Sequence, residues 1–334
     1  MTVGFVGPAA VLTFTVGLVV LVAGAEAVVR GGSEVAARFG VRPAVVGLTV
    51  VSLGTSLPEL AIGLSAVADG NGDLAVGNIV GTNLVNILLV LGLAAVLRPL
   101  RFERRTLRFD LPAGVVAALV LLVLASDGAL SLIDGLVLTA YGIGYLLMVI
   151  RSSRRTDRSA VGSPRHAELS EGTSRPAEAV PRPGRAVGVL VAGLVAIVVG
   201  AELLVDGAIS VAQAFGMSEA VVGLTVVAIG TSAPELVTII VATLRGDRAI
   251  AIGNLMGSNV FNIALVLGPT VLAAPAALAV PDAVVYGDLL LLAAAALVCL
   301  PAFWSRAVLS RAEGSAFVAA YVAYLVLVVT LRRG

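Results

Sequence analysis

The segment Gly47-Leu-Thr-Val-Val-Ser-Leu-Gly-Thr-Ser-Leu-Pro-Glu-Leu60 occurs again 176 positions later as Gly223-Leu-Thr-Val-Val-Ala-Ile-Gly-Thr-Ser-Ala-Pro-Glu-Leu236. A second pair follows at the same offset, with Gly77-Asn-Ile-Val-Gly-Thr-Asn-Leu-Val-Asn-Ile87 matching Gly253-Asn-Leu-Met-Gly-Ser-Asn-Val-Phe-Asn-Ile263. About half of the positions from 47 to 92 are identical to their partners, and no gap is needed. Self-similarity at a fixed offset indicates an internal repeat, so the chain contains a duplicated unit.

The duplicated segments belong to a very apolar chain. Of its 334 residues, 59% are hydrophobic and only 13% are charged, whereas an average soluble domain has about 25% charged residues. A helix of roughly 20 apolar residues is long enough to cross a bilayer. Stretches of this kind predict ten membrane spans, at residues 8–29, 44–68, 73–97, 110–126, 132–150, 186–206, 220–244, 250–273, 283–300 and 315–331.

The predicted spans divide equally between two halves. Residues 1–150 form the first five-helix repeat and residues 186–334 the second, while residues 151–185, rich in Arg, Ser, Pro and Glu, are predicted to be a disordered linker. Because five is odd, the second half enters the membrane with the opposite orientation. The predicted fold is an all-α membrane protein with ten transmembrane helices in two inverted five-helix repeats, as in transporters that bind substrate near the midplane.

The arginines predict the orientation in the membrane. All 22 basic residues are Arg, and twenty of them fall in loops on one side of the predicted spans. The loops on the other side contain only acidic charges, apart from the terminal Arg332 and Arg333. Since cytoplasmic loops are enriched in Lys and Arg, we expect a multi-pass protein of the inner (plasma) membrane with a cytoplasmic linker and both termini outside.

Two glutamates fall near the middle of predicted spans, Glu59 in the second and Glu235 in the seventh. A charged side chain at the bilayer centre costs roughly 2.5–3.5 kcal/mol even on the lower scales. One interpretation is a pair of structural glutamates, protonated or hydrogen-bonded within the bundle. The other is a cation site, which the neighbouring residues favour.

Those neighbours are all oxygen donors. On a helix, residues four apart share a face, and this spacing recurs in each half. Oxygen-only sites suit hard cations such as calcium and sodium rather than zinc, copper or iron. The residues are Thr55 and Ser56 before Glu59, Thr231 and Ser232 before Glu235, Thr82 with Asn86, and Ser258 with Asn262.

A proline precedes each glutamate, Pro58 in the first half and Pro234 in the second. Proline has no N–H for the helical hydrogen bond, so the carbonyl groups of Gly54 and Gly230 are expected to lose their partners. A carbonyl group freed inside a membrane must be satisfied by protein, water or an ion. The prolines therefore predict broken helices that could supply backbone ligands, although a purely structural kink would give the same pattern.

At these motifs the sequence resembles the sodium/calcium exchanger family of the cation/calcium antiporters, in particular its bacterial and archaeal members. The resemblance rests on Gly54-Thr-Ser-Leu-Pro-Glu59, Gly81-Thr-Asn-Leu-Val-Asn86, Gly230-Thr-Ser-Ala-Pro-Glu235 and Gly257-Ser-Asn-Val-Phe-Asn262, in this order. It covers both halves but not the linker.

The resemblance also implies roles for individual residues. Glu59 and Glu235 would bind calcium, with help from Thr55 and Thr231. Some prokaryotic members have Asp at the position of Asn86 or Asn262, so the cluster here would have two negative charges rather than three. Sodium would be bound by Ser56, Thr82, Ser232 and Ser258, and by the backbone carbonyl groups of Ser52 and Ala228.

The function predicted from the sequence is antiport of calcium against sodium by alternating access. A calcium/proton antiporter of the same fold is the alternative, and a channel-like or structural membrane protein is a further one. No nucleophile–base set and no cofactor fingerprint is present in the sequence, so we do not expect an enzyme or a bound cofactor. The expected partners are calcium and sodium ions and the lipid bilayer, with no nucleic acid and no obligatory protein partner.

Overall fold

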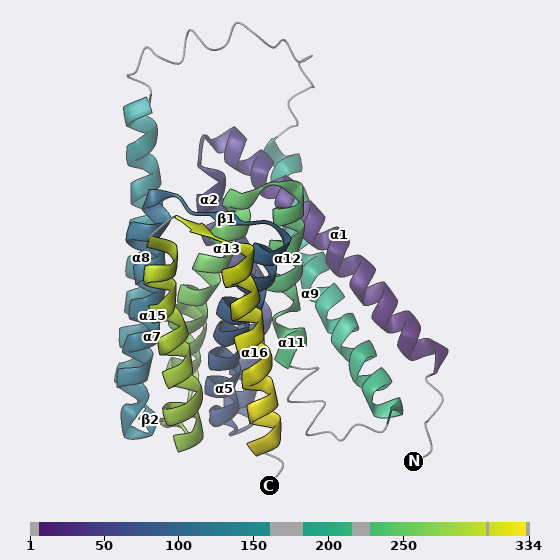
Figure 1. Cartoon of the computed structure of the whole chain (residues 1–334), viewed down its shortest axis with the longest axis vertical. Helices are drawn as coiled ribbons and strands as arrows, with labels where there is room; N and C mark the ends of the chain where they lie inside the picture. The colour runs from purple at the N-terminus through teal and green to yellow at the C-terminus, as the bar shows by residue number, and fades with distance from the viewer. Residues whose placement is uncertain (1–6, 161–182, 216–227, 305–306, 332–334) are drawn as a thin grey trace, which may run out of the picture.

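The computed structural model describes residues 7–160, 183–215, 228–304 and 307–331, and these are almost entirely helical (Figure 1). The first half contains α1 (Pro8–Phe39), α2 (Pro43–Val46), η1 (Gly47–Val51), α3 (Ser52–Thr55), α4 (Leu57–Ala68), α5 (Gly72–Leu84), η2 (Val85–Val90), α6 (Leu91–Leu97), η3 (Thr106–Asp110), α7 (Leu111–Leu124), η4 (Ala125–Asp127) and α8 (Leu132–Ala160). The second contains α9 (Pro183–Ala214), α11 (Ala228–Thr231), α12 (Ala233–Arg245), α13 (Arg248–Phe261), η7 (Asn262–Leu267), α14 (Gly268–Ala273), η8 (Val284–Leu289), α15 (Leu290–Trp304) and α16 (Arg311–Leu331).

Nine helical stretches in the described residues are long and apolar enough to cross a membrane. They correspond to nine of the ten predicted spans, and the chain is therefore a helical multi-pass membrane protein. The tenth, predicted at 220–244, is described only from residue 228, as α11 and α12. The total of ten spans stays a prediction.

Several helices are longer than the predicted spans. Helix α1 continues ten residues beyond residue 29, to Phe39. Helix α8 extends to Ala160 and α9 begins at Pro183, so both ends of the predicted linker 151–185 are helical. A helix that has already formed in the membrane adds further residues at little cost, and Arg151–Ala160 contains no proline to end it. Residues 161–182 lie outside the described part.

The first helix of each half packs against the other. Helices α1 and α9 lie side by side and slant away from the remaining bundle (Figure 1). A Cβ added at Gly24 would lie 2.7 Å from the Ile197 amide nitrogen, and one added at Gly31 would lie 2.7 Å from the Leu190 nitrogen. As the residue numbers rise along α1, the numbers of the contacted residues on α9 fall. These corresponding helices are therefore antiparallel, as expected for inverted repeats.

Glycines make this close approach possible. They recur every seven residues and match at the offset of the repeat, and at each of them an added Cβ would collide with the backbone of the other helix. Small residues at such intervals allow membrane helices to approach backbone to backbone. The glycines are Gly17, Gly24 and Gly31 on α1 and Gly193, Gly200 and Gly207 on α9.

We expect Gly24→Val to destabilise the protein by about 1–3 kcal/mol, the usual cost of overpacking, because its side chain would collide with the α9 backbone. Gly188→Val on α9 is the control, since nothing lies within 4 Å of an added Cβ there. The thermal unfolding midpoint of the detergent-purified variants measures the difference. Equal midpoints for the two variants would contradict the tight α1–α9 contact.

Two short antiparallel strand pairs connect the halves. Strand β1 (Leu100–Arg101) pairs with β4 (Val308–Leu309), and β2 (Ala129–Leu130) pairs with β3 (Leu278–Ala279). In each pair one strand comes from the first half and one from the second. The connections therefore tie the repeats together.

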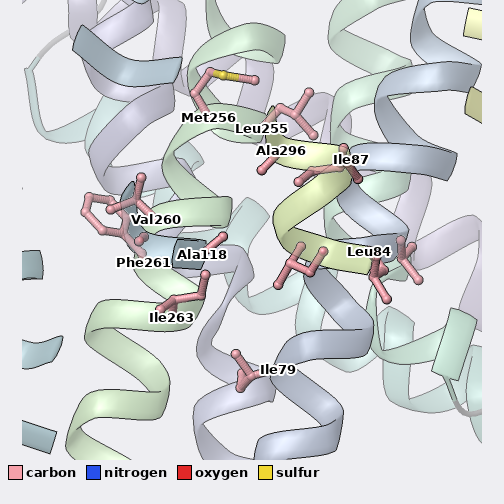
Figure 2. Packing of buried hydrophobic residues seen from close by; sticks show 14 of the residues in the cluster. Ile79, Leu84, Ile87, Ala118, Leu255, Met256, Val260, Phe261, Ile263 and Ala296 are labelled. Carbon is pink, nitrogen blue, oxygen red and sulfur yellow. The ribbon is translucent and has the colours of Figure 1, made fainter. Parts of the chain in front are cut away.

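The core is built around α5 and α13, the corresponding central helices of the two halves. Figure 2 shows Ile79, Leu84 and Ile87 from α5 and η2 close to residues of α13, η7, α7 and α15. Almost every residue of the span that contains α13 is buried. The polar residues in the middle of these helices are therefore held inside protein, namely Thr82, Asn83, Asn254, Ser258 and Asn259.

Candidate functional site

Both predicted helix breaks are present. Helix α3 ends at Thr55 and α4 begins at Leu57, with Ser56 between them at φ −87° and ψ 4°. In the second half, Ser232 separates α11 from α12 with nearly the same angles, φ −87° and ψ 5°. Since Pro58 and Pro234 occupy the second position of the helices that follow, the repeated Ser-x-Pro-Glu sequence starts a new helix in each half.

The two glutamates lie in the first turns of these new helices, Glu59 in α4 and Glu235 in α12. Both side chains are 0% exposed. The N-terminus of a helix has a partial positive charge that stabilises a carboxylate. The local fold therefore offsets part of the cost of burying each glutamate.

The other predicted site residues lie on α3, α5, η2, α11, α13 and η7, or at the two helix breaks. Thr231 is half-buried, and Ala228 is the first residue of α11, whose side chain lies outside the described part. The remaining residues are all buried: Ser52, Thr55, Ser56, Thr82, Asn86, Ser232, Ser258 and Asn262.

Polar contacts cross between the two halves within this cluster. The Ser56 hydroxyl donates to Oε1 of Glu235 at 3.5 Å, and the Ser52 and Ser258 hydroxyl oxygens are 3.1 Å apart. The Thr55 hydroxyl of the first half also donates to Oδ1 of Asn254 in the second half at 3.4 Å. The structure thus brings the two repeated motifs into one cluster, although they are far apart in the sequence.

Many oxygen atoms of the cluster have no hydrogen-bond partner among the described residues. Burying such a polar atom without a partner is costly, and an ionised carboxylate more so. A hard cation, which takes six to eight oxygen ligands in the case of Ca²⁺, would use these atoms. They are both carboxyl oxygens of Glu59, Oε2 of Glu235, Oγ1 of Thr82, Oγ of Ser232, and Oδ1 of Asn86 and Asn262.

Asn254 belongs to the same cluster but was missed as a site residue. Its side chain is 0% exposed, and its Oδ1 accepts hydrogen bonds from Thr55 at 3.4 Å and Ser258 at 3.4 Å. The Gly-Asn dipeptide that repeats at residues 77–78 and 253–254 is the sequence signal that could have identified Asn254. We infer that Asn254 positions Thr55 and Ser258.

Close backbone packing holds the cluster in place. A Cβ at Gly47 would lie 2.6 Å from the Ile250 carbonyl oxygen, and one at Gly257 would lie 2.7 Å from Oγ of Ser52. Helix α13 therefore packs directly on η1 and α3. This contact places Ser258 against Ser52.

A partly exposed ion-pair group connects α1 with α12. The Arg245 guanidinium donates through Nε to Oε2 of Glu26 at 2.8 Å, and its second nitrogen also contacts this carboxylate. Arg30 pairs with the same glutamate at 2.6 Å. These pairs attach the outer α1–α9 unit to the helix that contains Glu235.

The fold and the buried oxygen cluster are those of a multi-pass membrane ion transporter. The chain belongs to the sodium/calcium exchanger protein family, whose model matches residues 9–151 and 185–330. Members of this family are cation antiporters and not enzymes, so the chain is a cation/calcium antiporter.

Named relatives and solved structures agree with this assignment. The chain is 39% identical to the inner membrane protein YrbG of Escherichia coli (strain K12) over 78% of each chain. It is 30% identical to the sodium/calcium exchanger MaX1 of Methanosarcina acetivorans, over 94% of this chain and 97% of that one. Its fold is similar to that of the sodium-calcium exchanger NCX_Mj soaked with zero Na⁺ and Ca²⁺, with a TM-score of 0.80 and 29% identity over 95% of this chain and 98% of that chain.

Proposed function

We propose that the chain exchanges Ca²⁺ for Na⁺ across the inner membrane by alternating access, at a midplane site centred on Glu59 and Glu235. The observation that supports this best is the pair of fully buried glutamates, one from each repeat, in a single cluster of oxygen donors. The relatives named above include a sodium/calcium exchanger and an inner membrane protein. Both fit an ion exchanger of the inner membrane.

The proposed ligand sets follow the repeat. Ca²⁺ is bound by Glu59 and Glu235 with Thr55 and Thr231. Asn86 and Asn262 add amide oxygens that tolerate either ion without adding charge. Na⁺ is bound by Ser56, Thr82, Ser232 and Ser258, together with the backbone carbonyl groups of Ser52 and Ala228.

The proposed coupling between Ca²⁺ and Na⁺ transport follows from the charge of the two glutamates. Two carboxylates compensate one Ca²⁺ or two Na⁺ ions, whereas an unloaded site leaves two negative charges in a low-dielectric interior, where the penalty is several kcal/mol per ion. Reorientation of the unloaded carrier is therefore slow, so the protein moves only with cation bound. The two halves, residues 1–150 and 186–334, form the two inverted repeats that alternate access to the site.

The proposed orientation places the Arg-rich loops in the cytoplasm. By the distribution of arginines, the loop between residues 97 and 106 and the segment between α8 and α9 face inward, while both termini face outward. The ion-pair group of Glu26 and Arg245 then lies toward the cytoplasmic side.

Ion replacement separates sodium coupling from the proton-coupled alternative. In proteoliposomes loaded with NaCl, we expect an outward Na⁺ gradient to drive ⁴⁵Ca²⁺ uptake, and replacement of Na⁺ by choline at fixed pH to reduce it by at least about tenfold, because choline cannot enter an oxygen cage of this kind. Unchanged uptake in choline, driven instead by an imposed pH gradient, would show a calcium/proton antiporter.

A further inference from the structure

A small cavity lies in the core apart from the glutamate cluster, among α5, η2, α7, α13 and α15. Its volume is about 30 Å³, enough for one or two water molecules or a single ion. Its walls are mostly apolar, and none of the proposed transport ligands lines it. The polar residues that line it are Asn83, Asp110 and Asn259, with Cys299 also at the wall.

The two asparagines present unpaired oxygen atoms. Nδ2 of Asn83 donates to the Ile79 carbonyl at 2.9 Å, and Nδ2 of Asn259 donates to the Leu255 carbonyl at 3.0 Å. Since a carbonyl group accepts only from the amide nitrogen, these bonds fix which way each amide is turned. Oδ1 of both residues is buried without a hydrogen-bond partner among the described residues, and the side chains are 1% and 7% exposed.

The third polar residue is a carboxylic acid. Asp110 is 1% exposed, and the Tyr145 hydroxyl donates to its Oδ1 at 3.1 Å. No basic side chain in the described residues lies within 4.0 Å of this carboxyl group. The nearby Arg105 instead donates to the Val149 carbonyl at 3.4 Å and to the Ser152 hydroxyl. Arg105 and Arg42 therefore act on this carboxyl group only from a distance. A buried carboxylate without a direct ion pair is unfavourable, and this one adjoins a cavity with two more free oxygens.

We propose that this cavity binds one Na⁺ ion, held by the carboxylate of Asp110 and by Oδ1 of Asn83 and Asn259. All three ligands are oxygen atoms, which hard cations prefer. A monovalent ion balances the single negative charge, whereas a divalent ion would leave a net positive charge inside the membrane. Because the ligands come from η3, α5 and α13, the ion connects the core helices of both halves and makes the stability of the bundle depend on sodium.

The test measures equilibrium binding of ²²Na⁺ to the detergent-purified full chain. The parent of the series is the Glu59→Gln/Glu235→Gln double variant, in which the transport cluster has lost both charges. We expect this variant to retain one Na⁺ per chain, not displaced by choline or by KCl at the same concentration. When Asp110→Asn is added to this double variant, the affinity of the protein for Na⁺ should fall at least about tenfold, because the only charged ligand of the cavity is lost.

Asp288→Asn is the matched control. Asp288 also accepts a hydrogen bond from a tyrosine, Tyr324, at 2.9 Å, but it does not line the cavity. Its substitution should leave ²²Na⁺ binding unchanged. If the Asp110 variant does not purify as folded protein, Asn259→Ala must weaken binding instead, since it removes one oxygen without changing the charge.

The proposal is overturned if the double variant binds no ²²Na⁺, if KCl displaces the ion as well as NaCl does, or if both cavity variants bind it normally. The Asp110→Asn and Asn259→Ala substitutions leave every proposed transport ligand unchanged, so a loss of binding that they cause belongs to the cavity. Failure of calcium exchange in the unmodified protein would instead count against the proposed function alone.

Discussion

Replacing either Glu59 or Glu235 by glutamine is expected to reduce sodium-driven ⁴⁵Ca²⁺ uptake in proteoliposomes at least ~100-fold. Glutamine has nearly the same size, so packing is preserved, but one of the two charges that bind the divalent ion is lost. Removing one partner from a buried charge pair costs about 3–5 kcal/mol, which corresponds to a factor of roughly 100 or more in binding.

The control for this substitution is Glu34→Gln, since Glu34 lies on α1 with an exposed side chain. It should support uptake at the parental rate. Uptake above about a third of the parental rate in either Glu59→Gln or Glu235→Gln would show that the carboxylates are not the central ligands.

A valine at Gly257 is expected to disrupt the site through packing rather than charge. An added Cβ there would lie 2.5 Å from the Leu48 carbonyl oxygen and 2.9 Å from Cβ of Ser52. Valine must therefore push α13 away from α3, at a cost of about 1–3 kcal/mol or more. We expect a lower thermal unfolding midpoint and loss of ⁴⁵Ca²⁺ uptake, because the Ser52–Ser258 contact is broken.

Gly144→Val gives the matched control, because Gly144 lies within α8 and nothing is within 4 Å of its added Cβ. It should leave both the unfolding midpoint and the uptake rate close to those of the parent. If Gly257→Val behaves in the same way, the α13 contact does not hold the cluster together.

Local features were predictable from the sequence. Hydropathy located nine spans that the structure confirms, and proline chemistry located the breaks at Ser56 and Ser232. The helix ends were predicted less accurately, because hydropathy falls at Arg30 whereas α1 continues to Phe39. Hydropathy reports where lipid ends, and a helix can continue into water beyond that point.

Contacts between the halves were predictable only in outline. The repeat indicated that Glu59 and Glu235 would meet, but the contact between Ser52 and Ser258 depends on how α13 packs on α3. Asp110 was overlooked for another reason. Its counterpart Asp288 is 178 positions away and the tyrosines Tyr145 and Tyr324 are 179 apart, so a comparison at a fixed offset of 176 does not align them.

Equilibrium binding of ⁴⁵Ca²⁺ to the purified chain in sodium-free buffer tests most directly whether the two repeats share one calcium site. We predict one Ca²⁺ per chain, lost in Glu59→Gln and in Glu235→Gln alike, with no further loss in the double variant, because residues of one site are not additive. Retention of undiminished Ca²⁺ binding by either single variant would contradict a site built jointly by the two halves.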